Sequence, residues 1–147
     1  VSEGFYMLRE IDETNYSKED EIEQIENHLN NTGSLYIVAE SEKKVIGILE
    51  FENGSLKRTR HAGMFTIYIF KSHRDSGIGK IMMNELISWA EKNSVIEKVT
   101  LNVFSTNPRA IHLYEKCGFK EEGRCPEDMK LSDGTYIDSV LMYKFVK

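Results

Sequence analysis

Apolar residues recur along the chain with two different periods, and the two periods alternate from one end of the sequence to the other. Helical spacing, such as that of Ile22, Ile25 and Leu29, predicts helices over residues 18–30, 77–92 and 107–118. Alternating or continuous apolar runs between turn residues predict strands over residues 5–11, 35–40, 45–52, 64–70, 99–103, 119–123 and 136–145. This order predicts a mixed α/β fold with one mixed sheet and helices on both of its faces.

Length and composition are typical of one globular domain. At 147 residues and without a linker or repeat, the chain is predicted to form a single domain over residues 1–147. A net charge of −5 argues against a nucleic-acid partner, which needs a basic face, and suits an amine-bearing substrate. The longest apolar run, residues 64–70, is too short to cross a membrane. We therefore expect no membrane partner. Cys117 and Cys125 form no metal-ligand pattern, so we also expect no bound metal and a reducing, cytoplasmic location.

The segment between the strand at 64–70 and the helix at 77–92 has the properties of an anion site. Such a position offers free backbone N–H groups and the positive end of a helix dipole to a phosphate. Gly77 and Gly79 have no Cβ to keep an anion from the backbone, and Arg74 and Lys80 add positive charge. A Rossmann fingerprint is excluded, because Met82 stands at its third glycine position. By itself the segment predicts an anion site or a plain strand-to-helix turn.

Two motifs resemble those of one enzyme superfamily and occur in the same order. The first, Arg74-Asp75-Ser76-Gly77-Ile78-Gly79, is similar to the pyrophosphate loop Gln/Arg-x-x-Gly-x-Gly/Ala of the GNAT superfamily of acetyltransferases. The second begins Asn107-Pro108-Arg109-Ala110 and ends Leu113-Tyr114-Glu115-Lys116-Cys117-Gly118-Phe119, like the family's Asn-x-x-Ala and Leu-Tyr-x-x-x-Gly-Phe. A predicted strand and most of a predicted helix separate the motifs, as in that family. The direct match covers residues 64–123, and the order of strands fits nearly the whole chain.

The resemblance implies a fold and a co-substrate. The implied GNAT fold has a central mixed sheet of about six or seven strands flanked by helices, and its fourth and fifth strands, 64–70 and 99–103, splay apart. Acetyl-CoA is implied to lie in that splay. The positions that match those holding acetyl-CoA in the family are Ile67, Tyr68, Ile69, Arg74, Asp75, Ser76, Gly77, Ile78, Gly79, Lys80, Asn107, Ala110 and Tyr114.

The resemblance also implies a role for each group of these residues. The backbone of residues 67–69 would bind the pantetheine arm and polarise the thioester carbonyl, and residues 74–80 would hold the pyrophosphate. Asn107 would bind pantetheine, and Tyr114 would protonate the departing CoA thiolate. Seven residues of helix separate Asn107 from Tyr114, or ~10 Å, so both share one face with the small Ala110. The alternatives are that Asn107 is only a helix cap and Tyr114 only a core aromatic.

The implied mechanism is direct attack of a substrate amine on the thioester, without an acyl-enzyme. Because an alkyl ammonium has a pKa near ~10.4, a base or a water relay must remove a proton first. Many relatives place a carboxylate in the middle of the fourth strand, but this strand has Met64 and Phe65 there. Glu50 is our first candidate for the base, ahead of Glu52 and His61, although strand alternation also allows Glu50 and Glu52 to form a solvated face.

The expected function is transfer of acetyl from acetyl-CoA to a primary amine of a small molecule. One alternative is a protein N-terminal or lysine acetyltransferase, and a second is a non-catalytic CoA-binding or sensor domain. The basic segment 57–61 is expected to be a solvated hairpin, with contact to the anionic cofactor or to an acidic substrate as the alternative. Many members of the family that the chain resembles form homodimers, and the sequence leaves the oligomeric state open.

Overall fold

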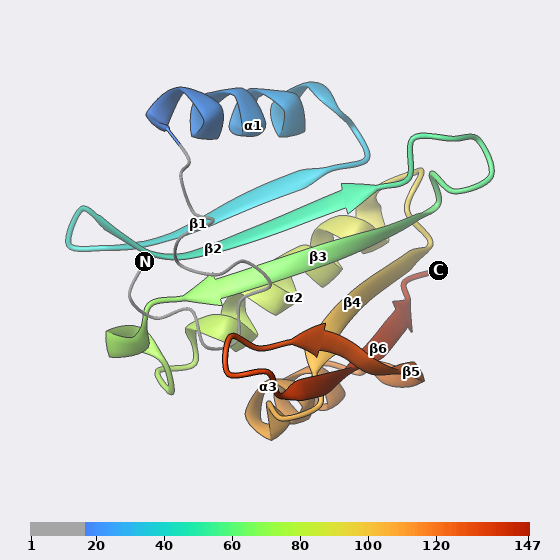
Figure 1. Cartoon of the computed structure of the whole chain (residues 1–147). Helices are drawn as coiled ribbons and strands as arrows, with labels where there is room; N and C mark the ends of the chain where they lie inside the picture. The colour runs from blue at the N-terminus through green and yellow to red at the C-terminus, as the bar shows by residue number, and fades with distance from the viewer. Residues whose placement is uncertain (1–16) are drawn as a thin grey trace.

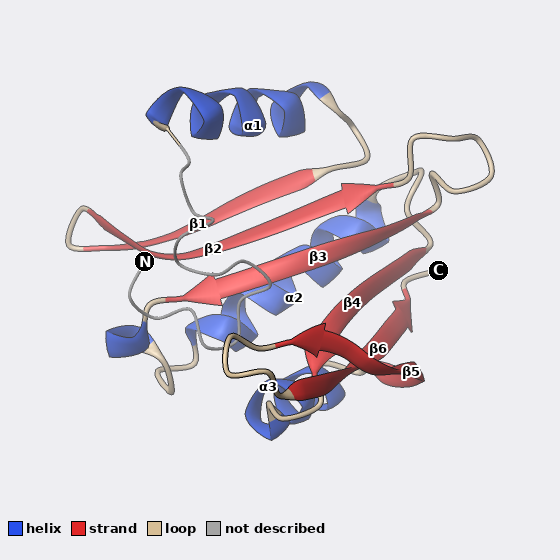
Figure 2. Ribbon diagram, viewed as in Figure 1, coloured by secondary structure: helices blue, strands red, loops and turns tan. Residues whose placement is uncertain are grey.

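The structure is a computed structural model that describes residues 17–147. Within these residues three α-helices, one short 3₁₀ helix (Lys71–His73) and six strands follow one another (Figures 1 and 2). In chain order the α-helices and strands are α1 (Lys18–Asn30), β1 (Leu35–Ser41), β2 (Lys44–Asn53), β3 (Ala62–Ile69), α2 (Ile78–Lys92), β4 (Lys98–Phe104), α3 (Pro108–Lys116), β5 (Lys120–Lys130) and β6 (Tyr136–Phe145). The mixed fold and every element predicted within the described residues are confirmed, while the strand predicted at 5–11 lies outside them.

The six strands form one open mixed sheet in the order β1-β2-β3-β4-β6-β5. Only β3 and β4 run parallel, and the other neighbours are antiparallel. β5 continues seven residues beyond the predicted end at Gly123, to Lys130. Its register against β6 shifts twice, and Pro126 lies inside the second shift, between Cys125 and Met129. The apolar pattern misses this half of the strand because it is a bulged edge, where polar residues and proline are tolerated.

The two faces of the sheet differ in character. Leu49 and Phe51 of β2 are fully buried on the face that α2 and α3 cover, and the Phe51 ring lies 5.5 Å from the Trp89 ring of α2. On the opposite face, α1 makes polar contacts: Gln24 Nε2 donates to Glu50 Oε2 at 2.9 Å. Figure 1 shows α1 on one side of the sheet and the other two helices behind it. The apolar core therefore lies between the sheet and the α2–α3 layer.

Helix α1 presents a different face to the sheet from the one its apolar spacing indicates. Leu29 is 77% exposed and Ile22 is 45% exposed, whereas His28 is buried. The reason is the polar character of the facing strands, because Glu50 of β2 takes a hydrogen bond from α1 rather than an apolar contact. A helix on such a surface is held by hydrogen bonds, and its apolar side chains stay partly in water.

Strands β3 and β4 part soon after they meet. Their parallel pairing covers three residue pairs: Ala62 with Lys98, Gly63 with Val99, and Met64 with Thr100. Within the described residues no pairing between the two strands continues beyond Met64, although β3 runs on to Ile69 and β4 to Phe104. The expected splay between these two strands is therefore present.

Gly63 is the middle residue of this short pairing, and its lack of a side chain is required there. A Cβ at Gly63 would lie 2.3 Å from Phe51 Cζ and 2.6 Å from the backbone oxygen of Glu52. We expect Gly63→Ala to lower the free energy of unfolding by about 1–3 kcal/mol, the usual cost of overpacking, measured by urea unfolding. Gly123→Ala is the matched control, because a Cβ there meets no atom within 4 Å. Equal stability of Gly63→Ala and the unaltered chain would contradict the close packing.

Candidate functional site

The loop before α2 ends in a helix N-terminus that no side chain caps. Gly77 is the N-cap residue, with a left-handed φ of 83°, and it makes no side-chain cap hydrogen bond. The other two helices are capped by their own residues: Ser17 accepts from the Asp20 amide, and Asn107 accepts from the Ala110 amide. The first amides of α2 are therefore left for another acceptor, and the loop has the geometry that an anion such as pyrophosphate needs.

Two arginines approach this loop from different elements. Arg74 Nε donates to the Ile69 backbone oxygen at 2.9 Å, and its guanidinium lies 5.9 Å from the Tyr68 ring centroid. Arg109 of α3 reaches the loop through Nη2, which lies 2.9 Å from Asp75 Oδ1. Sequence reasoning gave Arg109 no role, although it stands inside the second motif. Its position, two residues after the cap Asn107, was the signal that could have found it.

The missing side chain of Gly79 has a different structural role from the one that the sequence predicts. A Cβ on Gly79 would lie 3.1 Å from Leu113 Cδ2 and 3.2 Å from Ile69 Cδ1, so it would point into the protein. The missing side chain lets α2 pack closely against α3 and β3, and it does not make room for an anion. Gly77 fits the expectation better, because a Cβ there would meet no atom within 4 Å, and its positive φ is what requires glycine.

Helix α3 brings together the three residues expected on one of its faces. Asn107 caps the helix through Oδ1, which accepts from the Ala110 amide at 3.2 Å, so the helix-cap alternative is correct for that oxygen. The Tyr114 ring is buried against Phe65 of β3, with ring centroids 5.8 Å apart. Burial, with a smaller contribution from nearby Cys117, raises the pKa of Tyr114 to about 12. Tyr114 is thus a core aromatic whose hydroxyl stays protonated at neutral pH.

The far half of β3 borders the splay. Ile67, Tyr68 and Ile69 pair with β2 on one side and form no ladder with β4 on the other, over the strands that the structure describes. The loop at 74–79 follows this strand end, and the ion pair between Arg109 and Asp75 joins it to α3. Strand edge, uncapped helix and α3 therefore surround one end of the splay. Their donors and positive charges fit a long ligand with an anionic head.

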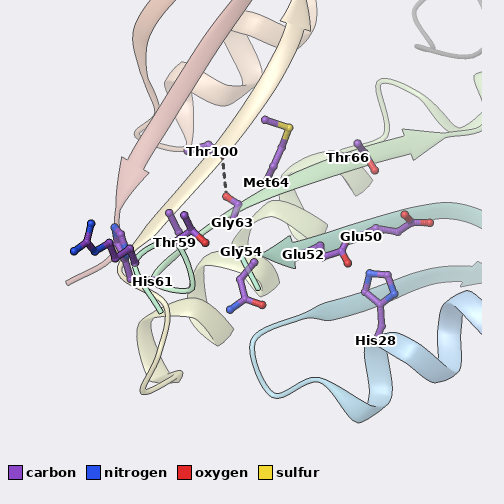
Figure 3. Close-up of a pocket in the computed structure, with 13 residues that line it drawn as sticks. His28, Glu50, Glu52, Gly54, Thr59, His61, Gly63, Met64, Thr66 and Thr100 are labelled. Atoms are coloured by element: carbon purple, nitrogen blue, oxygen red, sulfur yellow. Dashed lines mark hydrogen bonds between the residues drawn. The ribbon is translucent and has the colours of Figure 1, made fainter. Parts of the chain in front are cut away.

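An open pocket of about 600 Å³ lies on the α1 face, across the point where β3 and β4 meet (Figure 3). Its floor consists of residues paired across neighbouring strands: Glu50 with Thr66, Glu52 with Met64, and Met64 with Thr100. Glu50 is partly buried, and Glu52 is exposed. These two carboxylates share a face and lie roughly 7 Å apart along β2. The pocket thus offers two acidic groups beside the splay.

His28 of α1 also lines this pocket, and sequence reasoning missed it. Its ring packs edge-on against Tyr36 of β1, with centroids 5.6 Å apart. His28 Nδ1 lies 2.8 Å from the Gln24 backbone oxygen, and Nε2 is buried without a hydrogen-bond partner among residues 17–147. The available signal was weak, because a single histidine between apolar positions of a helix does not identify a site.

The basic segment at 57–61 forms the exposed loop between β2 and β3, as expected of a solvated hairpin. It precedes β3, whereas the loop at 74–79 follows it, so the length of β3, roughly 25 Å, lies between them. The alternative that this segment contacts the anionic head of a ligand at 74–79 is therefore wrong. Arg58 and His61 instead line the pocket on the α1 face.

The described residues form neither a metal-binding cluster nor a membrane-spanning helix. Within residues 17–147, no three or more His, Cys, Asp or Glu side chains are grouped to hold a metal ion. No helix in the same range is both long and apolar enough to span a bilayer. Cys117 and Cys125 are free, partly buried thiols, and burial raises the pKa of Cys117, which agrees with an inert side chain.

Comparisons with known proteins agree on one family. A model of the acetyltransferase (GNAT) family matches residues 5–119. The spermidine N(1)-acetyltransferase of Vibrio cholerae is 31% identical over 130 residues, which are 87% of this chain and 73% of that protein. The crystal structure of a GNAT acetyltransferase from Streptococcus pneumoniae has a TM-score of 0.93 at 26% identity, covering 97% of this chain and 84% of that one. Ribosomal-protein-alanine N-acetyltransferase from Brucella melitensis has a TM-score of 0.79 at 26% identity, covering 88% and 79%.

The family match extends over most of the chain, from before α1 to the end of α3. It includes the splayed strands and the uncapped helix, which are the features that fit an anionic thioester ligand. The chain therefore belongs to the GNAT family and is an acetyl-CoA-dependent N-acetyltransferase.

Proposed function

We propose that the chain acetylates a primary amine of a small di- or polyamine, which attacks acetyl-CoA directly in a ternary complex. The observation that carries this proposal is the pair of carboxylates, Glu50 and Glu52, on the floor of the pocket beside the splay. Two carboxylates roughly 7 Å apart attract an acceptor that carries more than one positive charge. The similarity to a spermidine N(1)-acetyltransferase supports the same class of acceptor.

Acetyl-CoA, in this proposal, lies between β3 and β4 with its pyrophosphate at the start of α2. Residues 74–80 supply the uncapped amides and the charges of Arg74 and Lys80, and Arg109 adds a further guanidinium. The backbone of Ile67, Tyr68 and Ile69 faces the thioester and the pantetheine arm. Asn107 uses Oδ1 for the helix cap, so its Nδ2 is the group that would donate to pantetheine.

Tyr114 is proposed as the donor to the departing sulfur. Its pKa of about 12 keeps the hydroxyl protonated at neutral pH. An ordinary thiol has a pKa of about 8.5, so complete proton transfer from this phenol to a thiolate would cost about 5 kcal/mol. Tyr114 therefore acts first by donating a hydrogen bond as negative charge grows on sulfur. Full transfer requires bound ligand to replace the apolar surroundings that raise its pKa.

A protein N-terminus is the second acceptor class, because the pocket is open to solvent and the structural neighbour from Brucella melitensis is a ribosomal-protein-alanine N-acetyltransferase. A peptide would have to place its terminal amine over the same two carboxylates. A non-catalytic CoA-binding role is the remaining alternative. The acceptor screen below separates the three.

We expect thiol release from acetyl-CoA to be fastest with spermidine, spermine or a diamine, and slow with neutral amino acids or short peptides. The physical reason is the attraction between a second ammonium group and the carboxylates of the pocket. A peptide preferred over all polyamines would contradict the proposed acceptor. Release no faster than spontaneous hydrolysis with every amine would indicate a non-catalytic CoA-binding domain.

Glu52→Gln tests the role of the pocket charges in the same assay. An exposed ion pair contributes up to about 1 kcal/mol, so KM for a polyamine should rise about threefold to fivefold while KM for acetyl-CoA stays constant. Glu26→Gln is the matched control, because Glu26 is exposed on α1 outside the pocket. Equal effects of the two substitutions would show that net charge alone matters.

Tyr114→Phe tests the sulfur donor. Loss of the hydroxyl should lower kcat about 100-fold, at the lower end of general-acid effects, while CoA affinity measured by calorimetry changes less than about twofold. The aromatic ring and its packing on Phe65 are kept, so the fold should be unaffected. An unchanged kcat would remove Tyr114 from the mechanism.

A further inference from the structure

His28 is the one buried ionisable side chain of α1, among the residues described, that reaches the acceptor pocket. The side chain is 9% exposed, and it lies in the last turn of the helix. Figure 3 shows its ring rising from α1 towards Glu50 and Glu52 on β2. Tyr36 of β1 packs against the ring from the side. The imidazole is therefore held in one place by the helix and by the strand below it.

The backbone of α1 determines which ring nitrogen holds a fixed proton. Nδ1 lies 2.8 Å from the Gln24 carbonyl oxygen, and a carbonyl can only accept a hydrogen bond. Nδ1 must therefore carry a hydrogen. In the neutral ring, Nε2 is then the nitrogen with the lone pair, and any proton that the ring gains or loses is the one on Nε2.

Nε2 has no hydrogen-bond partner in the described part of the chain, although it is buried. Leaving a buried polar atom unpaired costs about 1–3 kcal/mol, so such an atom calls for a ligand or water. His28 lines the pocket in which the acceptor is proposed to bind. Among residues 17–147, the other charged and titratable groups that line this pocket are Glu50, Glu52, Arg58 and His61, and Tyr36 packs against the His28 ring.

We propose that Nε2 of His28 accepts, through water in the pocket, the proton that the acceptor ammonium must lose before it attacks. This inference rests on the proposed small-amine function. The ammonium gives one N–H proton to a water, which gives one of its own protons to Nε2, so that a neutral amine and an imidazolium result. The amine nitrogen then bonds to the thioester carbon, and the C–S bond breaks. Tyr114 gives its hydroxyl proton to the departing sulfur, and a second proton from the nitrogen returns to Tyr114. His28 then releases its proton to solvent when the amide leaves.

A water relay is needed because His28 does not lie at the reacting centre itself. Its neighbour Tyr36 pairs with Glu50, and Glu50 pairs with Thr66 of β3. Two strand spacings therefore separate Tyr36 from the splay, or about 10 Å. Water fills such an open, polar space readily.

The same geometry separates the roles of His28 and Glu50. Glu50 Oε2 accepts a hydrogen bond from Gln24 Nε2, and a carboxylate is a weak proton acceptor near neutral pH. Glu50 and Glu52 are better suited to hold the ammonium groups of the acceptor by charge. His28 Nε2 holds the lone pair of the neutral ring, so it is the proton acceptor in this proposal. Glu50, our first candidate from the sequence, thus becomes a binding residue in this proposal.

The test compares His28→Gln with the unaltered chain, using spermidine as acceptor. We expect kcat/KM for spermidine to fall about 100-fold or more, and the decrease in rate towards acidic pH to change in shape. Affinity for CoA should stay within about twofold, since residue 28 lies on the face away from α2. The matched control is His112→Gln, an exposed histidine of α3, which should leave rate and pH profile unchanged.

Two further measurements do not depend on that variant folding normally. In His28→Ala, added imidazole should restore the rate in proportion to the concentration of neutral imidazole, which a purely structural histidine would not show. In the unaltered chain, ¹⁵N chemical shifts of the ring should report the tautomer with hydrogen on Nδ1. Hydrogen on Nε2 in the neutral ring would overturn the proposal.

Other outcomes are equally decisive. A His28→Gln rate within about threefold of the unaltered chain overturns the role of His28. If the decrease in rate towards acidic pH changes in Glu50→Gln but not in His28→Gln, then Glu50 and not His28 accepts the proton. Absence of turnover by the unaltered chain with every di- and polyamine overturns the proposed acceptor. The tautomer of the His28 ring then still tests whether Nε2 is the nitrogen with the lone pair.

Discussion

The separation of β3 and β4 after three residue pairs is the constraint on which the rest of this structure depends. Parallel strands normally continue side by side, because each ladder bond satisfies a backbone donor and an acceptor. Where the two strands part, these groups need other partners. Aromatic packing stabilises the parted arrangement from below: Phe65 contacts both Tyr114 and Phe119, with ring centroids 5.8 and 5.7 Å apart. The opening is thus held by the packing of the core.

The two faces of the sheet contribute different groups to the candidate site. On one face, α2 and α3 bury the core and present an uncapped helix end and the Arg109 side chain at the end of β3. On the other face, α1 covers a polar surface through hydrogen bonds and leaves an acidic pocket. In the proposed complex, the anionic head of acetyl-CoA and a cationic acceptor would therefore lie at opposite ends and on opposite faces of one opening. Their reactive groups can meet only where β3 and β4 part.

The middle of β3 offers no side chain that could accept a proton. Met64 is 46% exposed on the pocket face, and Phe65 is buried on the core face, so neither supplies a proton acceptor. The acidic residues come from β2, and α1 supplies an imidazole nitrogen that has no hydrogen-bond partner among residues 17–147. A polar helix–sheet contact is less favourable than an apolar one of the same area. Here that contact positions ionisable groups beside the opening.

The family and the order of the described elements were determined by the sequence alone, and the residues proposed to hold acetyl-CoA were predicted from it. They depend on local signals, such as the glycines before α2, the Asn107-Pro108 start of α3 and the apolar periods, which operate over a few residues. The purpose of Gly79, the ion pair of Arg109 with Asp75 and the buried face of α1 were decided only by the tertiary structure. Each depends on which distant element packs against a residue. The apolar spacing of Ile22 and Leu29 predicted the helix correctly. It did not predict that His28 faces the sheet, because that depends on the polar strands opposite the helix.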